Sequence, residues 1–218
     1  MIDLALRVLA AYLMGSVNGA LLIGRFRGID IRMQGSGNAG GTNALRTQGW
    51  IFASGVILID VIKASLAVRW LPHALIPAQY PIEWLAVACA SAVVLGHVYP
   101  VFHGFRGGKG VAPVLGTLLA LSTPLLLGLL AIWLVMMFVC GFVGLGSMVA
   151  AVSLPILVHL AAARGWLAPE DVIPLTVFGV VYAAFVIWTH RSNIARMRAG
   201  IEPRARKLWL LGRLRDRR

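Results

Sequence analysis

The sequence predicts an all-α integral membrane protein with about seven transmembrane helices, some of them short or broken. Of its 218 residues 59% are hydrophobic, and the mean hydropathy is +0.83, whereas in soluble domains about half of the residues are apolar. Apolar runs of about 20 residues recur along the chain, and this length crosses a bilayer core of ~30 Å. The polar stretches between these runs are short, and several of them are basic.

The predicted helices follow the apolar runs in order. Four runs are interpreted as single spans and one longer block as several, near residues 3–24, 50–71, 83–101, 113–163 (the block) and 172–189. The first run, "MIDLALRVLAAYLMGSVNGALLIGRF", lacks the small-residue cleavage pattern of a signal peptide and is too long for one. We therefore interpret it as a span that is retained.

Basic residues determine the predicted orientation. They gather in the loops at 25–48 and 102–112, and ten of the twenty lie in the tail from Arg191 onward. The positive-inside rule places these three segments in the cytoplasm, with the N-terminus outside and the C-terminus cytoplasmic. The same rule accounts for the net charge of +12, so no nucleic-acid partner is indicated, and the tail is expected to meet anionic membrane lipids.

The block at 113–163 has to cross the membrane an odd number of times, because it joins a cytoplasmic loop to an outside loop near 164–171. Three short helices satisfy this condition, and a single crossing with a re-entrant pair is the alternative; we prefer the first. Breaks are expected where residues interrupt helices, namely at Pro124, Gly141, Gly144, Gly146 and Pro155.

The expected domain organisation is one transmembrane domain, residues 1–203, followed by a basic tail, residues 204–218. The tail "RARKLWLLGRLRDRR" fits either an interfacial amphipathic helix or a disordered basic segment. Cys89 and Cys140 lie in apolar segments without CxxC spacing, so we interpret both as inert core thiols.

The first polar island is "GSGNAGGTNALR", residues 35–46. Its glycines allow a ligand to approach backbone N–H groups, and Arg46 offers a planar fork suited to phosphate. Neutral donors come from Ser36, Asn38, Thr42 and Asn43. Composition alone leaves two interpretations open, an anion-binding loop and an ordinary flexible loop.

The second island contains "GFRGGKG", residues 104–110, with Lys109 among glycines at the predicted start of a helix. A helix N-terminus carries partial positive charge and N–H groups that favour phosphate, so the backbone of Gly107, Gly108 and Gly110 is expected to assist Lys109. The alternative is that Arg106 and Lys109 act only as topology charges. The stretch is not a Walker A loop, because His103 and Gly110 stand where that motif needs Gly and Ser or Thr.

The third island is "HRSNIARMRAGIEPR", residues 190–204. If the helix continues, His190 and Asn193 share one face, and Glu202, which follows Gly200, is placed to pair with one of the arginines. Taken alone, a His at a membrane boundary is more often a packed or interfacial residue than a catalyst.

Two charged residues stand out inside a predicted span. Asp60 and Lys63 in "LIDVIKAS" are one helical turn apart and can pair, and both a functional role and a structural ion pair stay open. In the first span, small and polar residues are interpreted as helix-packing positions, namely Gly15, Ser16, Asn18 and Gly19.

Several familiar catalytic sets are absent from the sequence. No His is followed by an Asp after four intervening residues, and no Ser lies in a GxSxG elbow. The carboxylates on the predicted cytoplasmic side are too few and too scattered for a Mg²⁺ site: Asp30, Asp60, Glu202 and Asp216. No metal site is therefore expected.

Together the islands are far more specific than any one of them. "GSGNAGGTNALR", "GHVYPVFHGFRGGKGVAP" and "HRSNIARMRAGIE" closely resemble the three motifs of the bacterial acyl-phosphate:glycerol-3-phosphate acyltransferase family, and "LIDVIKAS" and "GLGS" at 144–147 resemble further family positions. The resemblance spans roughly residues 10–203. The chain departs from the family pattern at Arg106 (usually Lys), Gly144 (commonly Ser), Gly41 (commonly Ala) and Pro113 (commonly Ala or Thr).

The resemblance implies a multi-pass enzyme of the bacterial inner membrane with its active site facing the cytoplasm. Such an enzyme transfers a fatty acyl group from acyl phosphate to the 1-hydroxyl of glycerol 3-phosphate, giving lysophosphatidate and phosphate, as the first step of phospholipid synthesis. It needs no metal or cofactor, and its functional partner is the soluble acyltransferase that makes acyl phosphate.

The residues that match the family motifs are the candidate site. Catalytic roles are expected for Arg46, Lys109, His190 and Asn193; substrate-binding roles are expected for Ser36, Asn38, Thr42, Asn43, Gly107, Gly108, Gly110, Ser147 and Glu202. The hydroxyl proton has two possible acceptors, His190 and a substrate phosphate oxygen, and the resemblance favours the second. His190 and Asn193 would then position glycerol 3-phosphate, with Glu202 orienting them.

A membrane transporter or binding protein for a phosphorylated solute is the competing class, because transporters also place short, glycine-broken helices around anionic substrates. Against it, the sequence shows no convincing internal repeat, and its polar islands all lie on one predicted face of the membrane.

Overall fold

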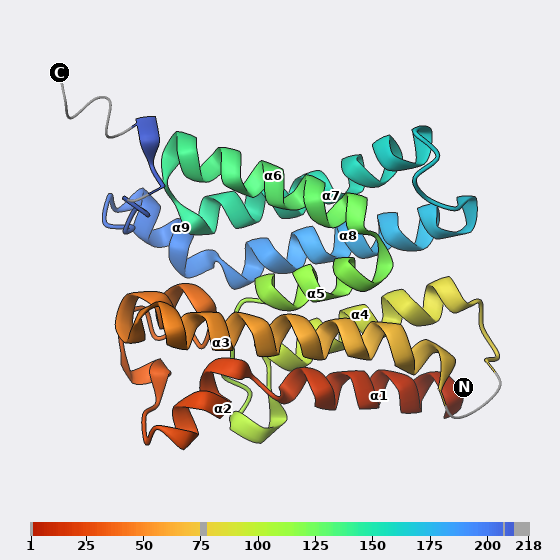
Figure 1. Cartoon of the computed structure of the whole chain (residues 1–218), viewed down its shortest axis with the longest axis horizontal. Helices are drawn as coiled ribbons and strands as arrows, with labels where there is room; N and C mark the ends of the chain where they lie inside the picture. The colour runs from red at the N-terminus through yellow and green to blue at the C-terminus, as the bar shows by residue number, and fades with distance from the viewer. Residues whose placement is uncertain (1, 75–77, 207, 212–218) are drawn as a thin grey trace. The chain divides into compact units, whose positions relative to one another are not determined.

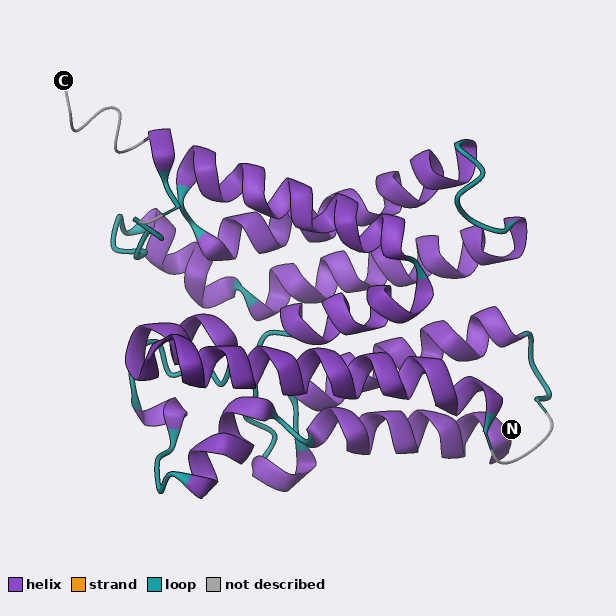
Figure 2. Cartoon of the chain, viewed as in Figure 1, coloured by secondary structure: helices purple, strands orange, loops and turns teal. Residues whose placement is uncertain are grey.

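The computed structural model describes residues 2–74, 78–206 and 208–211, and these residues form helices joined by short loops (Figures 1 and 2). No strand occurs among them, so the predicted all-α class is confirmed. The chain divides into two compact units, Met1–Thr123 and Pro124–Arg218, called unit 1 and unit 2 here.

The helices of unit 1 follow one another through short connections. In chain order they are α1 (Ile2–Ser16), α2 (Gly19–Phe26), η1 (Ile31–Met33), α3 (Gly41–Trp70), η2 (Leu71–His73), α4 (Ile82–Val98), η3 (Val101–His103) and α5 (Val111–Leu121). Packing is most extensive between α1 and α4 and between α3 and α5, and α1 and α2 also contact α3 (Figure 1).

Glycines allow these helices to approach closely. A β-carbon at Gly15 of α1 would overlap the carbonyl oxygen of Val93 in α4, and one at Gly96 of α4 would overlap that of Tyr12 in α1. Gly116 of α5 lies in the same way against the carbonyl of Val61 in α3. Small residues at such contacts let helix backbones pack tightly within a membrane.

The first predicted span, residues 3–24, is broken into α1 and α2, which are bent by 47° relative to each other. Asn18 ends the break, because its side-chain oxygen accepts the N–H groups of Ala20 and Leu21 and so caps α2. This residue had been expected only as a packing position.

The second predicted span begins where a glycine interrupts α3. Gly49 has φ +82° and ψ −179°, which are not helical values, so a short helix (41–48) precedes the long segment 50–70. A positive φ is easily adopted by glycine. The long segment agrees with the predicted span at 50–71. The short helix contains the last residues of the first glycine-rich island, 41–46, so this part of the island directly precedes the span.

The helices of unit 2 are α6 (Thr123–Cys140), α7 (Val143–Ala163), α8 (Pro169–Thr189) and α9 (Arg191–Arg198), and α7 packs along α8 (Figure 1). The block at 113–163 therefore forms three helices, α5 to α7, as predicted, although only α5 is short. The breaks lie at Ser122 and at Gly141, whose φ is +71°, whereas Gly144, Gly146 and Pro155 lie inside α7.

Among the described residues, five helices are long and apolar enough to cross a membrane, or six if α1 and α2 form one span. The remaining apolar helix, α5, has 11 residues, which gives it a length of about 16 Å against a bilayer core of ~30 Å. The multi-pass helical architecture is confirmed, and a seventh crossing by α5 stays a prediction.

The described start of the tail turns back onto the end of α6. Ala205 donates its N–H to the carbonyl of Gly141, and the Trp209 indole donates to that of Val139. The Arg204 guanidinium lies 4.3 Å from the ring centre of Phe142 and 4.0 Å from that of Trp209. The rest of the tail, Lys207 and residues 212–218, lies outside the described residues, and so does most of the predicted amphipathic or disordered segment.

Candidate active site

The first glycine-rich island is folded around the side chain of Asn43. Its amide nitrogen donates to the carbonyls of Ile31 (3.1 Å) and Gln34 (3.0 Å), and its oxygen accepts the Ser36 N–H (2.9 Å). Both amide hydrogens are therefore used within the loop, and the side chain is 1% exposed. Asn43 therefore holds the loop together from inside the protein. The residue type alone could not distinguish this structural role from the expected role in ligand binding.

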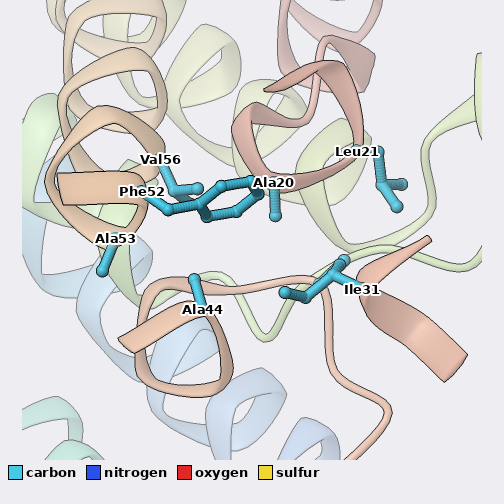
Figure 3. Close-up of a cluster of buried hydrophobic side chains, with 8 residues drawn as sticks. Ala20, Leu21, Ile31, Ala44, Phe52, Ala53 and Val56 are labelled. Atoms are coloured by element: carbon cyan, nitrogen blue, oxygen red, sulfur yellow. The ribbon is translucent and has the colours of Figure 1, made fainter. Parts of the chain in front are cut away.

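An apolar cluster lies beneath this loop. It joins α2, η1 and both parts of α3, and Figure 3 shows Phe52 and Val56 of α3 meeting Ala20 of α2; its buried members are Ala20, Leu21, Ile31, Ala39, Ala44, Phe52, Ala53 and Val56. The polar side chains expected to bind ligand have the opposite placement. Ser36, Thr42 and Arg46 are exposed, and Asn38 is half-buried. The loop thus presents polar groups outward over a packed apolar base.

The second island is held by the C-terminal end of α4. Gly107 and Gly108 donate their N–H groups to the carbonyls of Val98 (3.0 Å) and His97 (3.1 Å). A β-carbon at Gly108 would overlap the His97 ring, which explains the need for glycine at this position. Because both N–H groups are used inside the protein, these glycines position the loop, and Gly110, with φ +85°, opens α5 directly after Lys109.

The two islands are joined to each other. The Ala39 N–H donates to the carbonyl of Gly107 (3.4 Å), so the backbones of the two loops touch. Arg32 makes a second link, since its guanidinium donates to the carbonyls of His103 (2.8 Å) and Arg106 (3.3 Å). Unit 1 therefore brings the island that ends at Arg46 and the island that contains Lys109 into one connected structure.

Asp30 holds Arg32 in this linking position through an ion pair of 2.7 Å. The hydrogen bond from Arg32 lowers the pKa of Asp30 below its usual value of 3.8, although partial burial opposes the shift. The stability contributed by the pair is complete above that usual value and is lost only as the pH falls through the lowered pKa. The link is thus intact at neutral pH. The sequence analysis did not predict this ion pair, although the close spacing of Asp30 and Arg32 in the sequence is compatible with one.

The third island lies in unit 2, where α8 ends and α9 begins. The Nδ1 atom of His190 is 2.9 Å from the carbonyl of Val186, which can only accept, so Nδ1 carries a proton and donates it. Asn193 donates to Glu202 over 2.6 Å, and Arg196 pairs with the other oxygen of Glu202 over 2.6 Å. The predicted pairing of Glu202 with an arginine is confirmed, and this buried carboxylate also orients Asn193.

Two positions of α7 complete the description of unit 2. The Ser147 hydroxyl donates to the carbonyl of Val143 (2.9 Å) one turn earlier in the same helix. Gly144 lies directly under the Asn193 side chain, and a β-carbon there would crowd that amide. Within the part of the chain that the structure describes, no three His, Cys, Asp or Glu side chains are grouped so as to hold a metal ion.

Asp60 and Lys63 form the expected ion pair, with 2.8 Å between Lys63 Nζ and Asp60 Oδ1. His97 joins them, because its Nδ1 lies 3.2 Å from the same Asp60 oxygen. The sequence carried no signal that His97 meets this pair, since it lies 37 residues after Asp60, in the next long helix, α4.

Comparison with known proteins places this arrangement in a family. A family model described as glycerol-3-phosphate acyltransferase matches residues 5–200. The chain belongs to the glycerol-3-phosphate acyltransferase family. The resemblance seen in the three islands is thereby confirmed.

Curated members of the glycerol-3-phosphate acyltransferase family match almost the whole chain. A protein of that name from Thermosynechococcus vestitus is 42% identical over 208 residues, covering 92% of this chain and 94% of the relative. Another from Gloeobacter violaceus is 40% identical over 196 residues, covering 89% and 91%.

Two solved structures of a family member, the integral membrane glycerol 3-phosphate acyltransferase PlsY, have the same fold. The glycerol 3-phosphate form gives a TM-score of 0.76 at 32% identity and covers 92% of this chain and 94% of that one. The lysophosphatidic acid form gives a TM-score of 0.75 at 30% identity. This chain is accordingly a multi-pass membrane protein of the glycerol-3-phosphate acyltransferase family.

Proposed function

We propose that the protein transfers a fatty acyl group from acyl phosphate to the 1-hydroxyl of glycerol 3-phosphate, producing lysophosphatidate and inorganic phosphate. The family to which the chain belongs supports acyl transfer to glycerol 3-phosphate. The proposal includes the location: the bacterial inner membrane, with the three islands at the cytoplasmic face. It also includes the supplier of the donor, a soluble enzyme that makes acyl phosphate.

One observation carries the proposal. The loop that ends at Arg46 and the loop that contains Lys109 are joined through Ala39 and Gly107, so one connected structure offers two cations. Donor and acceptor each bear a phosphate, and charge-assisted contacts to phosphate are roughly twice as strong as neutral hydrogen bonds. Each of the two loops could therefore bind one of the two substrate phosphates through its cation.

The proposed chemistry needs little from the protein besides position and charge. The oxygen of the 1-hydroxyl attacks the acyl carbonyl carbon, the bond from that carbon to the phosphate oxygen breaks, and inorganic phosphate leaves. The donor is already activated, because phosphate is a good leaving group. Arg46 and Lys109 would stabilise the charge that develops on the phosphates, with Ser36, Asn38 and Thr42 assisting.

The experiment that tests this proposal compares two acyl donors. Purified protein in detergent receives radiolabelled glycerol 3-phosphate with either palmitoyl phosphate or palmitoyl-CoA, without added metal, and labelled lysophosphatidate is counted. Product from palmitoyl phosphate alone is the expected result. Product from the CoA thioester alone would overturn the donor, and no product from either with folded protein would favour the transporter, which vesicle uptake of labelled glycerol 3-phosphate would then reveal.

The proton of the hydroxyl is proposed to pass to a phosphate oxygen of the substrate. His190→Ala should then raise KM for glycerol 3-phosphate, because His190 would position this substrate, while the pH–rate profile of kcat keeps its acidic limb. A histidine base would instead give a limb of the pH–rate profile that disappears in the variant, with kcat lower by about 10²–10⁴-fold. His159→Ala, at an exposed histidine of the same unit, is the matched control.

A further inference from the structure

Four buried polar side chains meet where the first span is broken. Asn18 belongs to the break itself, Asp60 and Lys63 to α3, and His97 to α4, and none is more than 8% exposed. His97 Nδ1 lies 3.3 Å from Lys63 Nζ and 3.5 Å from Asn18 Nδ2, in addition to its contact with Asp60. These four residues, the polar brace, connect three different segments of unit 1.

The ion pair of the brace satisfies both ends of the break. Lys63 donates to the carbonyls of Gly15 (2.9 Å) and Val17 (2.7 Å), which the end of α1 leaves without helical partners. Asp60 accepts the N–H of Gly19 (3.1 Å) at the start of α2. A cation at a helix C-terminus and an anion at a helix N-terminus are the favourable arrangement for both helix dipoles.

The same residues also hold the two glycine-rich islands. Asn18 donates to the carbonyl of Ala39 (3.1 Å) in the first island, and the Ala39 N–H donates to Gly107 of the second. His97 accepts the Gly108 N–H with its carbonyl oxygen, and its ring lies against the Gly108 α-carbon. Asn18 and His97 are thus bonded directly to the islands, and Asp60 and Lys63 reach them through His97.

We propose that Asn18, Asp60, Lys63 and His97 are positioning residues, which set where the two phosphate-binding loops stand relative to each other. A buried ion pair is weak support for stability, since apolar residues of similar volume often do as well. Holding two loops at a defined spacing, however, needs directional contacts of the kind that the brace makes. The inference rests on the proposed function of those loops.

A second buried ion pair, which lies in α1 rather than in α3, provides a matched control. Asp3 and Arg7 of α1 pair over 2.7 Å, and Arg7 donates to the carbonyl of Leu71. In each of the two pairs one carboxylate oxygen, Oδ2, accepts no hydrogen bond from the described residues. Asp3 and Asp60 are therefore alike in burial and pairing, and only Asp60 has contacts that lead to the islands.

The kinetics of Asp60→Asn and Asp3→Asn distinguish a role in positioning the two loops from a role in stabilising the fold. Asp60→Asn should raise KM for glycerol 3-phosphate, with a loss in kcat/KM on the scale of about 10²-fold that a small misplacement of binding groups can cause. Asp3→Asn should lower the melting temperature and leave KM unchanged. Equal KM values for Asp60→Asn and the wild type would overturn the proposal.

A double variant keeps the test valid if Asp60→Asn does not fold. Asp60→Leu with Lys63→Met removes both charges together, and such replacements are often neutral or stabilising. The proposal expects a folded protein with a raised KM; wild-type KM in this variant would show that the pair serves packing alone.

Hydrogen exchange supplies a readout that does not depend on the reaction. Peptides covering residues 36–46 and 104–111 should exchange faster in Asp60→Asn than in the wild type and in Asp3→Asn. Unchanged exchange would overturn the positioning role. Faster exchange in a protein whose wild type transfers no acyl group would keep the brace and reject the proposed function.

Discussion

Replacing Lys109 with methionine is expected to lower kcat/KM for acyl transfer by about 10²–10³-fold, the usual effect of removing one group that stabilises charge in a transition state. Methionine keeps the length and apolar stem of the side chain and removes only the charge. Lys109 follows Gly108, which is bound to α4, so its backbone is placed by the loop and should stay in position. Steady-state rates at several concentrations of each substrate would measure the effect.

Two further variants make the Lys109 result specific. Lys109→Arg keeps the charge on a larger, planar group and should recover only part of the activity, because the two side chains bind phosphate with different geometry. Arg25→Ala removes an exposed cation of α2 and should change kcat/KM by no more than about twofold, since exposed charges contribute little. Wild-type kinetics in Lys109→Met would reject the phosphate role of this loop.

Gly108→Ala is expected to impair both stability and substrate binding. The new methyl group would overlap the His97 ring, and forcing extra atoms into a packed site typically costs about 1–3 kcal/mol. The His97 ring is held by its contacts with Asp60 and Asn18, so we expect the loop to move away from α4 and to displace Lys109. We expect a lower melting temperature and a KM for the phosphate substrates raised by at least tenfold, or about 1.4 kcal/mol in binding free energy.

Gly104→Ala is the matched control for this steric effect. Gly104 has φ +64°, so alanine there is strained by roughly 1–2 kcal/mol, but no atom lies within 4 Å of the new β-carbon. Its stability should fall while KM stays near that of the wild type. A Gly108→Ala protein with unchanged KM would mean that the loop tolerates the methyl group without moving Lys109.

The helices of the fold were predictable because apolar runs indicate the helical segments and helix-breaking residues indicate their ends. The long segment of α3 begins after Gly49, where a span was predicted to begin, Gly141 ends α6 where a break was predicted, and the block after residue 113 divides into three helices. The short α5 ends close to the break expected at Pro124, whereas α6 and α7, with 18 and 21 residues, are longer than expected, because Gly144, Gly146 and Pro155 lie inside α7 without ending it.

The residues proposed for the candidate site come from the sequence motifs, whereas the contacts that these residues make could not be predicted from the sequence. Asn43 and Thr42 are neighbours with similar hydrogen-bonding groups, yet Asn43 is buried in its own loop and Thr42 is exposed. The difference arises from the carbonyls of Ile31 and Gln34, whose positions depend on how the whole loop folds over the apolar cluster. Likewise, only the approach of α4 decides that the N–H groups of Gly107 and Gly108 face inward.

The polar brace also has a consequence for how the chain is made. Asp60 and Lys63 lie near the middle of the long segment of α3, where a charged residue costs roughly 2.5–3.5 kcal/mol to insert. The groups that compensate them are the carbonyls of Gly15 and Val17 and the N–H of Gly19, and these groups precede α3 in the chain. The hydrogen-bond partners of both charges are therefore synthesised before the charges themselves. We therefore expect α1, α2 and α3 to be inserted together, because the break between α1 and α2 holds the hydrogen-bond partners of the charges in α3.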